Sequence, residues 1–178
     1  MSPSPTRMSE NSKRRVRTEK LSRLRQGHSP RVLDLFAGCG GLSLGFYTAG
    51  FEINASLELD DYAAQTHAEN FFSDKDEISH YGKGWDIRET EPEELFLECG
   101  TGEEIIEKID VIVGGPPCQS FARVGRAKLR EVDENPEAFL DDSRGNLYLR
   151  YLDYVRKLEP LAIVIENVPD ALNYGDHN

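Results

Sequence analysis

The chain has 178 residues, 38% of them hydrophobic and 30% charged, which is enough for one domain with a sizeable core. Its three cysteines, Cys39, Cys99 and Cys118, are widely spaced and form no CxxC pair, a pattern that argues against a disulfide framework or a cysteine-based metal cage. No stretch is long and apolar enough to span a membrane and no leader peptide is evident, so we expect a reduced, cytoplasmic protein without a metal.

The net charge of −11 is unevenly distributed. Residues 1–28 hold eight Lys and Arg against two Glu, a balance of +6, so the rest of the chain carries −17. Such an acidic body would repel a nucleic acid unless positive charge is concentrated locally or supplied elsewhere. We expect residues 1–28 to form a basic, disordered tail and residues 29–178 to form the folded part. A basic arm that contacts phosphates is the alternative for the tail.

After the tail, short apolar runs alternate with helical patterns. The runs predict strands at 31–35, 52–57, 109–113 and 161–165, a further short strand ending in Gly84–Ile87, and helices at 42–47, 62–71, 147–158 and within the acidic stretch 89–108. This alternation is typical of a doubly wound, mostly parallel α/β sheet. The last apolar run would lie near an open edge of that sheet, and such an edge invites a partner strand.

Three glycines, Gly38, Gly40 and Gly41, join the first expected strand to the helix that follows it. Glycines at this position let a ligand approach the backbone, although a tight turn without a ligand explains them equally well. Glu58 follows about 20 residues later at the end of the second strand, where doubly wound folds place a carboxylate against ribose hydroxyls. Asp86, at the next expected strand end, would accept from an adenine amino group. Alternatively, Glu58 is a solvated residue at the end of a strand, and Asp86 is a helix cap or turn residue. Together these residues predict a nucleoside pocket, for a nicotinamide dinucleotide or for S-adenosylmethionine.

Cys118 follows the third long apolar run in the segment VGGPPCQS, where two prolines fix the backbone and aim the thiol. A small buried thiol in a structural turn is the alternative. A presented thiolate suits methyl transfer to C5 of cytosine, because C5 becomes nucleophilic only after a nucleophile adds at C6. Glu166, after the last strand, would be the acid that protonates N3, or else a capping carboxylate. A nicotinamide dehydrogenase has no general need for a cysteine at this position.

In the order and spacing of these segments the chain resembles the C5-cytosine DNA methyltransferase family. The matching segments are DLFAGCGGLSLGF (34–46), Glu58, Asp86 in GWDIR, GGPPCQSF (114–121), DSRGNLY (142–148) and ENV (166–168). The resemblance implies a Rossmann-like fold that uses S-adenosylmethionine, held by Phe36, Gly38, Gly40, Gly41, Glu58, Asp86, Ile87 and Pro116. It also implies a catalytic set of Cys118, Glu166, Pro117, Gln119 and Asn167, with Cys118 as nucleophile, Glu166 on the cytosine pairing edge and Gln119 at the start of a loop that closes over a base extruded from double-stranded DNA.

Two departures limit what the resemblance implies. The stretch 123–141 is longer than the usual family interval, and the QxRxR arginines, the target-recognition region and the returning C-terminal helix have no counterpart. We therefore expect an incomplete fold and an enzyme half that acts at the nucleoid, with target recognition supplied by a second chain or lost by truncation. A non-catalytic remnant and a methyltransferase acting on cytosine in transfer RNA are the alternatives. Whether the purpose is restriction–modification or regulation is left open.

Overall fold

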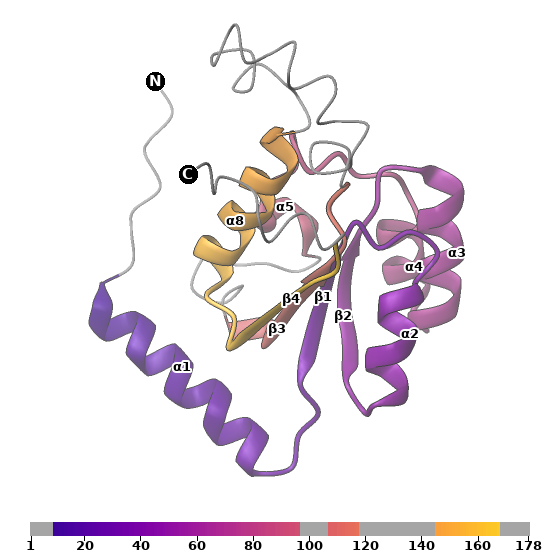
Figure 1. The fold of residues 1–178 in the computed structure, drawn as a ribbon. Coiled ribbons are helices and arrows are strands. Elements are labelled where there is room, and N and C mark those ends of the chain that lie inside the picture. The colour runs from indigo at the N-terminus through magenta and orange to yellow at the C-terminus, as the bar shows by residue number, and fades with distance from the viewer. Residues whose placement is uncertain (1–8, 97–106, 118–144, 168–178) are drawn as a thin grey trace, which may run out of the picture.

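The computed structural model describes residues 9–96, 107–117 and 145–167 (Figure 1). Its helices are α1 (Glu10–Arg25), α2 (Gly41–Thr48), α3 (Asp61–Phe71), α4 (Lys75–Tyr81), α5 (Pro92–Leu95) and α8 (Gly145–Leu158). Its strands are β1 (Arg31–Leu35), β2 (Glu52–Leu57), β3 (Val111–Gly114) and β4 (Ala162–Ile165). Among the described residues, no helix is both long and apolar enough to cross a bilayer.

The four strands form one parallel sheet in the order β2-β1-β3-β4. Leu33 pairs with Ala55 on one side and with Ile112 on the other, and Ile112 pairs in turn with Ile163. The chain therefore winds outward from β1 to β2, then crosses back to β3, so that the winding direction reverses between β1 and β3. Ligands of open α/β sheets bind at the carboxyl ends of the strands on either side of such a switch point.

Helices lie on both sides of the sheet, with α2, α3 and α4 on one side and α5 and α8 on the other (Figure 1). The core between these layers is built from the apolar strand residues and from two tyrosines of α8, Tyr151 and Tyr154, whose side chains are fully buried. The doubly wound parallel α/β fold is thus confirmed, and the four long apolar runs are the four strands, with bounds shifted by at most two residues.

The basic N-terminal segment departs from the expected disordered tail, because residues 10–25 form helix α1 packed on the body. Val16 and Lys20 are buried on the contact side, and the Lys20 ammonium donates to the carbonyl oxygens of Leu158 (3.2 Å) and Glu159 (2.9 Å) at the end of α8. Arg23 pairs with the buried carboxylate of Asp110. The helix is ordered because its cations meet acceptors that lie far away in the sequence.

Two local predictions were also incomplete. Gly84–Ile87 is not a strand: Trp85 donates its backbone N–H to the Glu58 carbonyl (2.7 Å), but the segment continues as a turn. Helix α4 was not predicted, although its cap is visible in the sequence, since the Asp74 carboxylate accepts from the backbone N–H groups of Asp76 (2.8 Å) and Glu77 (3.3 Å).

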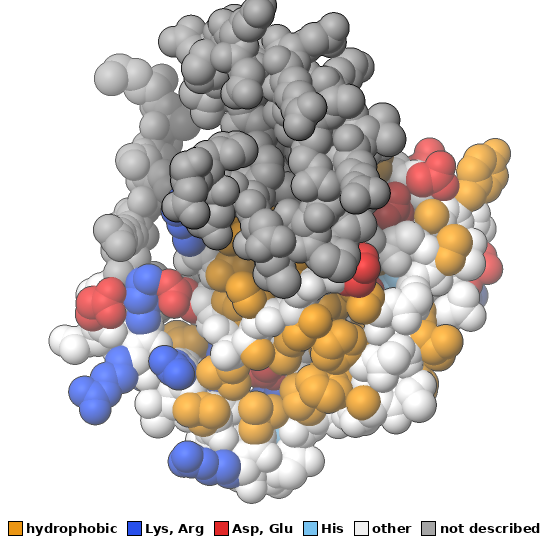
Figure 2. All heavy atoms as spheres, in the orientation of Figure 1, with side chains coloured by type: hydrophobic (Ala, Val, Ile, Leu, Met, Phe, Trp, Pro, Cys, Tyr) orange, Lys and Arg blue, Asp and Glu red, His pale blue; other side chains and the backbone are white. Residues whose placement is uncertain are grey.

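Strand β4 is the last strand of the described sheet, as expected from the pattern of apolar runs. Three of its residues are exposed, with Ile163 at 45% and Val164 at 41% beside Ala162. Hydrophobic side chains gather on the face that Figure 2 shows, in the region of β4 and α2. A shallow apolar hollow on α2 is lined by Leu42, Phe46 and Phe51 together with Gly41, Gly45 and Ala49.

Candidate active site

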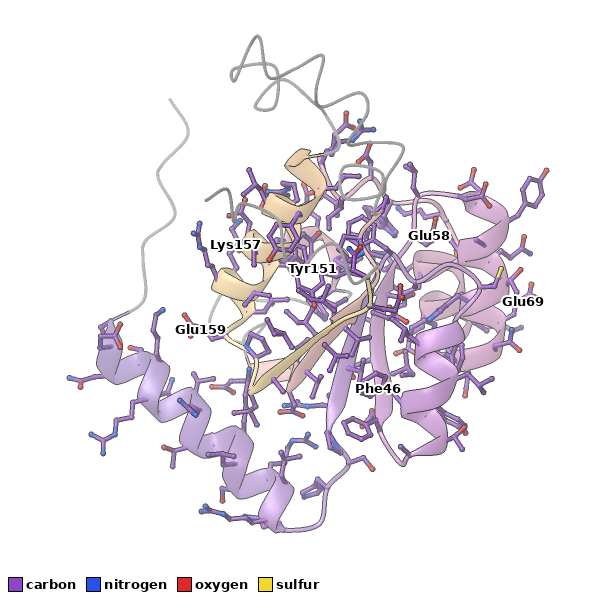
Figure 3. The ribbon with its side chains drawn as sticks, viewed as in Figure 1. Phe46, Glu58, Glu69, Tyr151, Lys157 and Glu159 are labelled. Atoms are coloured by element: carbon purple, nitrogen blue, oxygen red, sulfur yellow. The ribbon has the colours of Figure 1, made fainter. Side chains whose placement is uncertain are left out.

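The carboxyl ends of the four strands meet at one edge of the sheet and carry most of the predicted site. Phe36 follows β1, Glu58 follows β2, Gly115 follows β3 and Glu166 follows β4. Because the strands are parallel and adjacent, these four positions lie side by side along that edge. Glu58 lies at this edge in Figure 3. The structure thus brings the predicted strand-end residues together at one edge of the sheet.

The turn between β1 and α2 has a backbone that favours glycine. Phe36, Gly38 and Gly40 all have positive φ angles, of 61°, 54° and 98°. A Cβ atom on Gly40 would overlap the ring of Phe71 and would lie 3.1 Å from Cδ2 of His67. The turn therefore needs glycine at position 40 for close packing against α3 as well as for its φ angle. Gly41 then begins α2 and is exposed.

Glu58 ties this turn to the start of α3. Its Oε2 accepts from the backbone N–H of Gly38 (2.9 Å), and its Oε1 accepts from the backbone N–H of Asp60 (3.0 Å). Asp60 is in turn the N-cap of α3, accepting from the backbone N–H of Ala63 at 2.9 Å. Each carboxylate oxygen has two lone pairs, so Glu58 keeps acceptor capacity for hydroxyl donors of a ligand.

Asp86 lies next to Glu58 because Trp85 is hydrogen-bonded to the Glu58 backbone. Its carboxylate is engaged by Arg88, whose Nε donates to Oδ1 at 2.9 Å and to Oδ2 at 3.0 Å. The hydrogen bonds from Arg88 hold the pKa of Asp86 below its usual range, despite an opposing effect of partial burial. Ile87 is buried, and its carbonyl accepts from Nε of Arg150 (2.8 Å). A ligand donor at Asp86 would share the carboxylate with Arg88.

The ends of β3 and β4 bring Glu166 against the segment that leads to Cys118. The Glu166 backbone N–H donates to the Gly114 carbonyl (3.0 Å), and a Cβ on Gly115 would lie 3.3 Å from Glu166 Oε2. Asn167 Nδ2 donates to the carbonyl of Pro116 (3.2 Å). Pro116 is buried and Pro117 exposed, while Cys118 and Gln119 lie outside the described residues.

The predicted residues thus form two neighbouring groups at one sheet edge. The first contains Phe36, Gly38, Gly40, Gly41, Glu58, Asp86 and Ile87, and the second contains Pro116, Pro117, Glu166 and Asn167. The sequence analysis missed a third group that lies beneath the first: Asp34, Ser43 and His67, which are fully buried and hydrogen-bonded to one another. One signal for it was available, since Asp34 is a charged residue between the apolar residues Leu33 and Leu35.

Comparison with known proteins identifies the family. The profile of the family described as C-5 cytosine-specific DNA methylase matches residues 30–178, and the chain belongs to this family. It is 38% identical over 151 residues to the putative type II methyltransferase M.OihORF3336P of Oceanobacillus iheyensis, a match that covers 84% of this chain and 31% of the relative. It is 35% identical over 148 residues to the type II methyltransferase M.XorII of Xanthomonas oryzae pv. oryzae, a match that covers 83% of this chain and 30% of the relative.

A solved structure is similar as well. It is a putative DNA modification methyltransferase encoded within a prophage (E. coli), 33% identical, with a TM-score of 0.51, and the match covers 82% of this chain and 34% of that one. The chain therefore spans about a third of the length of these relatives. A shorter relative, the type II methyltransferase M.HgiGI of Herpetosiphon aurantiacus, is 33% identical with 79% of this chain and 92% of the relative covered. Methyltransferases of this kind in general use S-adenosylmethionine as methyl donor.

Proposed function

We propose that the chain is the catalytic and cofactor-binding part of a DNA (cytosine-5-)-methyltransferase, which transfers methyl from S-adenosylmethionine to C5 of cytosine in double-stranded DNA. The observation that carries this proposal is the position of Glu166 against Gly115, in the segment that continues through two prolines into Cys118. A carboxyl group and a nucleophile on adjacent strand ends are what addition to the cytosine ring requires.

In this proposal, the Cys118 thiolate adds to C6 of an extruded cytosine while Glu166 protonates N3, so that C5 becomes nucleophilic. S-adenosylmethionine, when bound, supplies the methyl group that C5 takes up. A base then removes the C5 proton, the bond between C6 and the Cys118 sulfur breaks as the C5–C6 double bond is restored, and N3 returns its proton to Glu166. Pro116 and Pro117 form the wall of the base pocket, Asn167 holds Pro116 through its hydrogen bond, and the loop beginning at Gln119 covers the extruded base.

The residues of the first group fit a nucleoside cofactor. A Cβ on Gly38 would meet nothing within 4 Å, so the backbone of the β1–α2 turn is open to a ligand at that position. Glu58 has acceptor capacity for the two ribose hydroxyls, and Asp86 would accept from the adenine amino group alongside Arg88. We assign cofactor binding to Phe36, Gly38, Gly40, Gly41, Glu58, Asp86, Ile87 and Pro116.

We further propose that target recognition is supplied by polypeptide beyond the residues described, in the same protein or in a second chain. The support for this is that the chain spans about a third of the relatives it matches, and that β4 exposes Ile163 and Val164 at the sheet edge. The acidic charge of the body agrees, because phosphate contacts need cations from elsewhere. This proposal places the protein with its DNA substrate, in the cytoplasm and at the nucleoid.

The deciding experiment is transfer of labelled methyl from S-adenosylmethionine to duplex DNA, with the chain alone and with the additional segment of a full-length relative added. Label in DNA that disappears in Cys118→Ser is the expected result, because serine keeps the shape but is a far weaker nucleophile at neutral pH. Label that persists in Cys118→Ser would overturn the mechanism, and label that enters transfer RNA in preference to DNA would overturn the substrate.

A further inference from the structure

Three polar side chains lie fully buried beneath the β1–α2 turn and form a continuous hydrogen-bonded chain. The Ser43 hydroxyl oxygen lies 2.7 Å from Oδ2 of Asp34 and 2.8 Å from Nε2 of His67. Because an ionised carboxylate only accepts, Ser43 donates its proton to Asp34, and its oxygen accepts from Nε2–H of His67. The order of donors thus runs from His67 to Ser43 to Asp34, and it places the His67 proton on Nε2.

This hydrogen-bonded chain joins β1, α2 and α3, the three elements packed around the glycine turn. Asp34 is in β1, two residues before Phe36, and Ser43 is in the first turn of α2, directly after the glycines. His67 is in α3, whose N-cap, Asp60, donates its backbone N–H to Glu58 just after β2. His67 also touches the turn itself, since its Cδ2 lies 3.1 Å from where a Gly40 Cβ would be. A shift of any one of the three side chains would therefore displace the turn relative to Glu58.

The arrangement is not what core packing alone would select. Within the part of the chain that the structure describes, Oδ1 of Asp34 and Nδ1 of His67 are buried without a hydrogen-bond partner. Buried polar atoms without partners lower stability, and apolar side chains of similar volume would fill the same space without that loss. The network therefore lowers the stability of the fold at the place where β1, the β1–α2 turn and α3 meet.

We propose that Asp34, Ser43 and His67 are positioning residues that hold the β1–α2 turn and Glu58 in the arrangement that binds S-adenosylmethionine. This inference rests on the proposed function for the identity of the ligand. None of the three side chains touches the ligand; they act through Phe36, Gly40 and the helix that follows Glu58. The network thereby determines cofactor affinity rather than the chemistry at the cytosine ring.

The charge of Asp34 adds an electrostatic contribution to this role. Burial raises the pKa of Asp34 to about 6, and the hydrogen bonds from Ser43 oppose the rise, whereas the charge of Glu58 adds to it. The other titratable groups near Asp34 are His67, whose pKa burial lowers to about 4, and Tyr151 of α8, whose pKa burial raises. Between pH 5 and 7.5 those two groups stay neutral. Protonation of Asp34 therefore reverses its hydrogen bond to Ser43 and removes a negative charge that favours the sulfonium cation.

The first test compares binding of S-adenosylhomocysteine by titration calorimetry. His67→Met removes the N–H donor, while His67→Gln keeps one near the place of Nε2. Lys20→Met is the matched control, because it removes a buried polar group at the opposite end of the sheet. We expect affinity about tenfold weaker in His67→Met, close to that of the unchanged chain in His67→Gln, and unaltered in Lys20→Met.

Each outcome of this test is decisive. Equal affinities in His67→Met and the unchanged chain would overturn the positioning role alone. If circular dichroism shows that His67→Met does not fold, Ser43→Ala takes its place under the same criterion. Failure of the unchanged chain to bind any cofactor would instead overturn the proposed function, and this inference with it.

A second test measures how cofactor affinity depends on pH. If the network were merely structural, this dependence would be the same for a charged and an uncharged ligand. Affinity of the unchanged chain for S-adenosylmethionine should fall several-fold from pH 7.5 to pH 5, whereas Asp34→Asn should bind equally across that range. S-adenosylhomocysteine, which lacks the sulfonium charge, should show a smaller dependence in the unchanged chain. A flat profile for S-adenosylmethionine in the unchanged chain would overturn the contribution of the Asp34 charge.

Discussion

At the scale of single residues, Glu58 has the largest share in joining the parts of the proposed cofactor site. It holds the turn through Gly38 and the start of α3 through Asp60, and its carboxylate oxygens keep lone pairs that could accept further hydrogen bonds. Its carboxylate therefore shapes the turn, and in the proposed function it also binds the ribose. Removal of the side chain ends both.

Glu58→Ala should weaken S-adenosylhomocysteine affinity by about 1 to 3 kcal/mol, the usual effect of losing hydrogen bonds to a charged group. Calorimetry measures this directly. Glu69→Ala is the matched control: Glu69 is an exposed carboxylate of α3 that points away from the sheet (Figure 3) and accepts from the side chain of Gln65. Similar affinities in the two variants would remove Glu58 from the ribose site.

Asp34 and His67 also make opposite contributions to the pH dependence of stability. Burial raises the pKa of Asp34 from 3.8 to about 6 and lowers that of His67 from 6.5 to about 4. The contribution of Asp34 to the free energy of unfolding is full below pH 3.8 and is lost as pH rises through 6. That of His67 is full above pH 6.5 and is lost as pH falls through 4. In the window between pH 4 and 6 the two slopes nearly cancel.

Removing one member of this pair should reveal the slope of the other. Relative to the unchanged chain, the free energy of unfolding of Asp34→Asn should fall by up to about 3 kcal/mol between pH 6.5 and pH 4. That of His67→Gln should rise over the same window. Urea unfolding at several pH values gives these slopes. Parallel pH profiles in all three proteins would show that the two groups do not titrate as their burial requires.

The site residues that were predictable from the sequence are those fixed by strand ends. Phe36, Glu58 and Glu166 each follow an apolar run, and a parallel sheet brings such positions to one edge whatever the details of packing. The hydrogen bond between Ser43 and His67 is different, because it joins residues 24 positions apart and exists only once α2 and α3 are docked. The hydrogen bonds from Arg88 to the Asp86 carboxylate likewise depend on a turn, where the sequence predicted the end of a strand.

At the scale of elements, α1 shows how composition misled the prediction. Its cations and few apolar residues are typical of a disordered tail. The acceptors that order it, Asp110 and the last carbonyls of α8, lie 87 and 138 positions away in sequence. Cations at the carboxyl end of a helix are also favoured by its dipole, and Lys20 occupies that place for α8. The residue pattern of α1 itself does not indicate that these acceptors are nearby.

Trypsin cleavage should distinguish a docked α1 from a free tail. Val16→Asp places a charge in a contact where Val16 is 1% exposed, so the helix should undock and the bonds after Lys20 and Arg23 should be cut at least tenfold faster. Leu21→Asp is the matched control, since Leu21 is 37% exposed on the same helix and should keep the slow rate. Rapid cleavage of the unchanged chain at these bonds would show that α1 is not docked.

At the scale of the whole molecule, the body combines an acidic charge with an apolar sheet edge. The side chains of Ile163 and Val164 are each more than 40% exposed, on the strand that ends the described sheet. Exposed strands pair readily with other strands, and natural proteins block such edges with charges or cover them. Strand β4 carries no charged side chain, since its four residues Ala162–Ile165 are all apolar, and among the described residues no further strand pairs with it.

The chain on its own should therefore self-associate at micromolar concentration, which sedimentation velocity at several loading concentrations measures. Val164→Lys places a charge on the edge strand and should shift the chain toward monomer without altering its circular dichroism. Leu44→Lys is the matched control: Leu44 is 58% exposed on α2, so the variant removes a similar apolar surface away from the strand edge. If association is lost equally in both variants, general surface hydrophobicity drives it rather than strand pairing. A monomer at every concentration of the unchanged chain would mean that β4 is covered in solution, and the exposed edge would no longer support a missing partner strand.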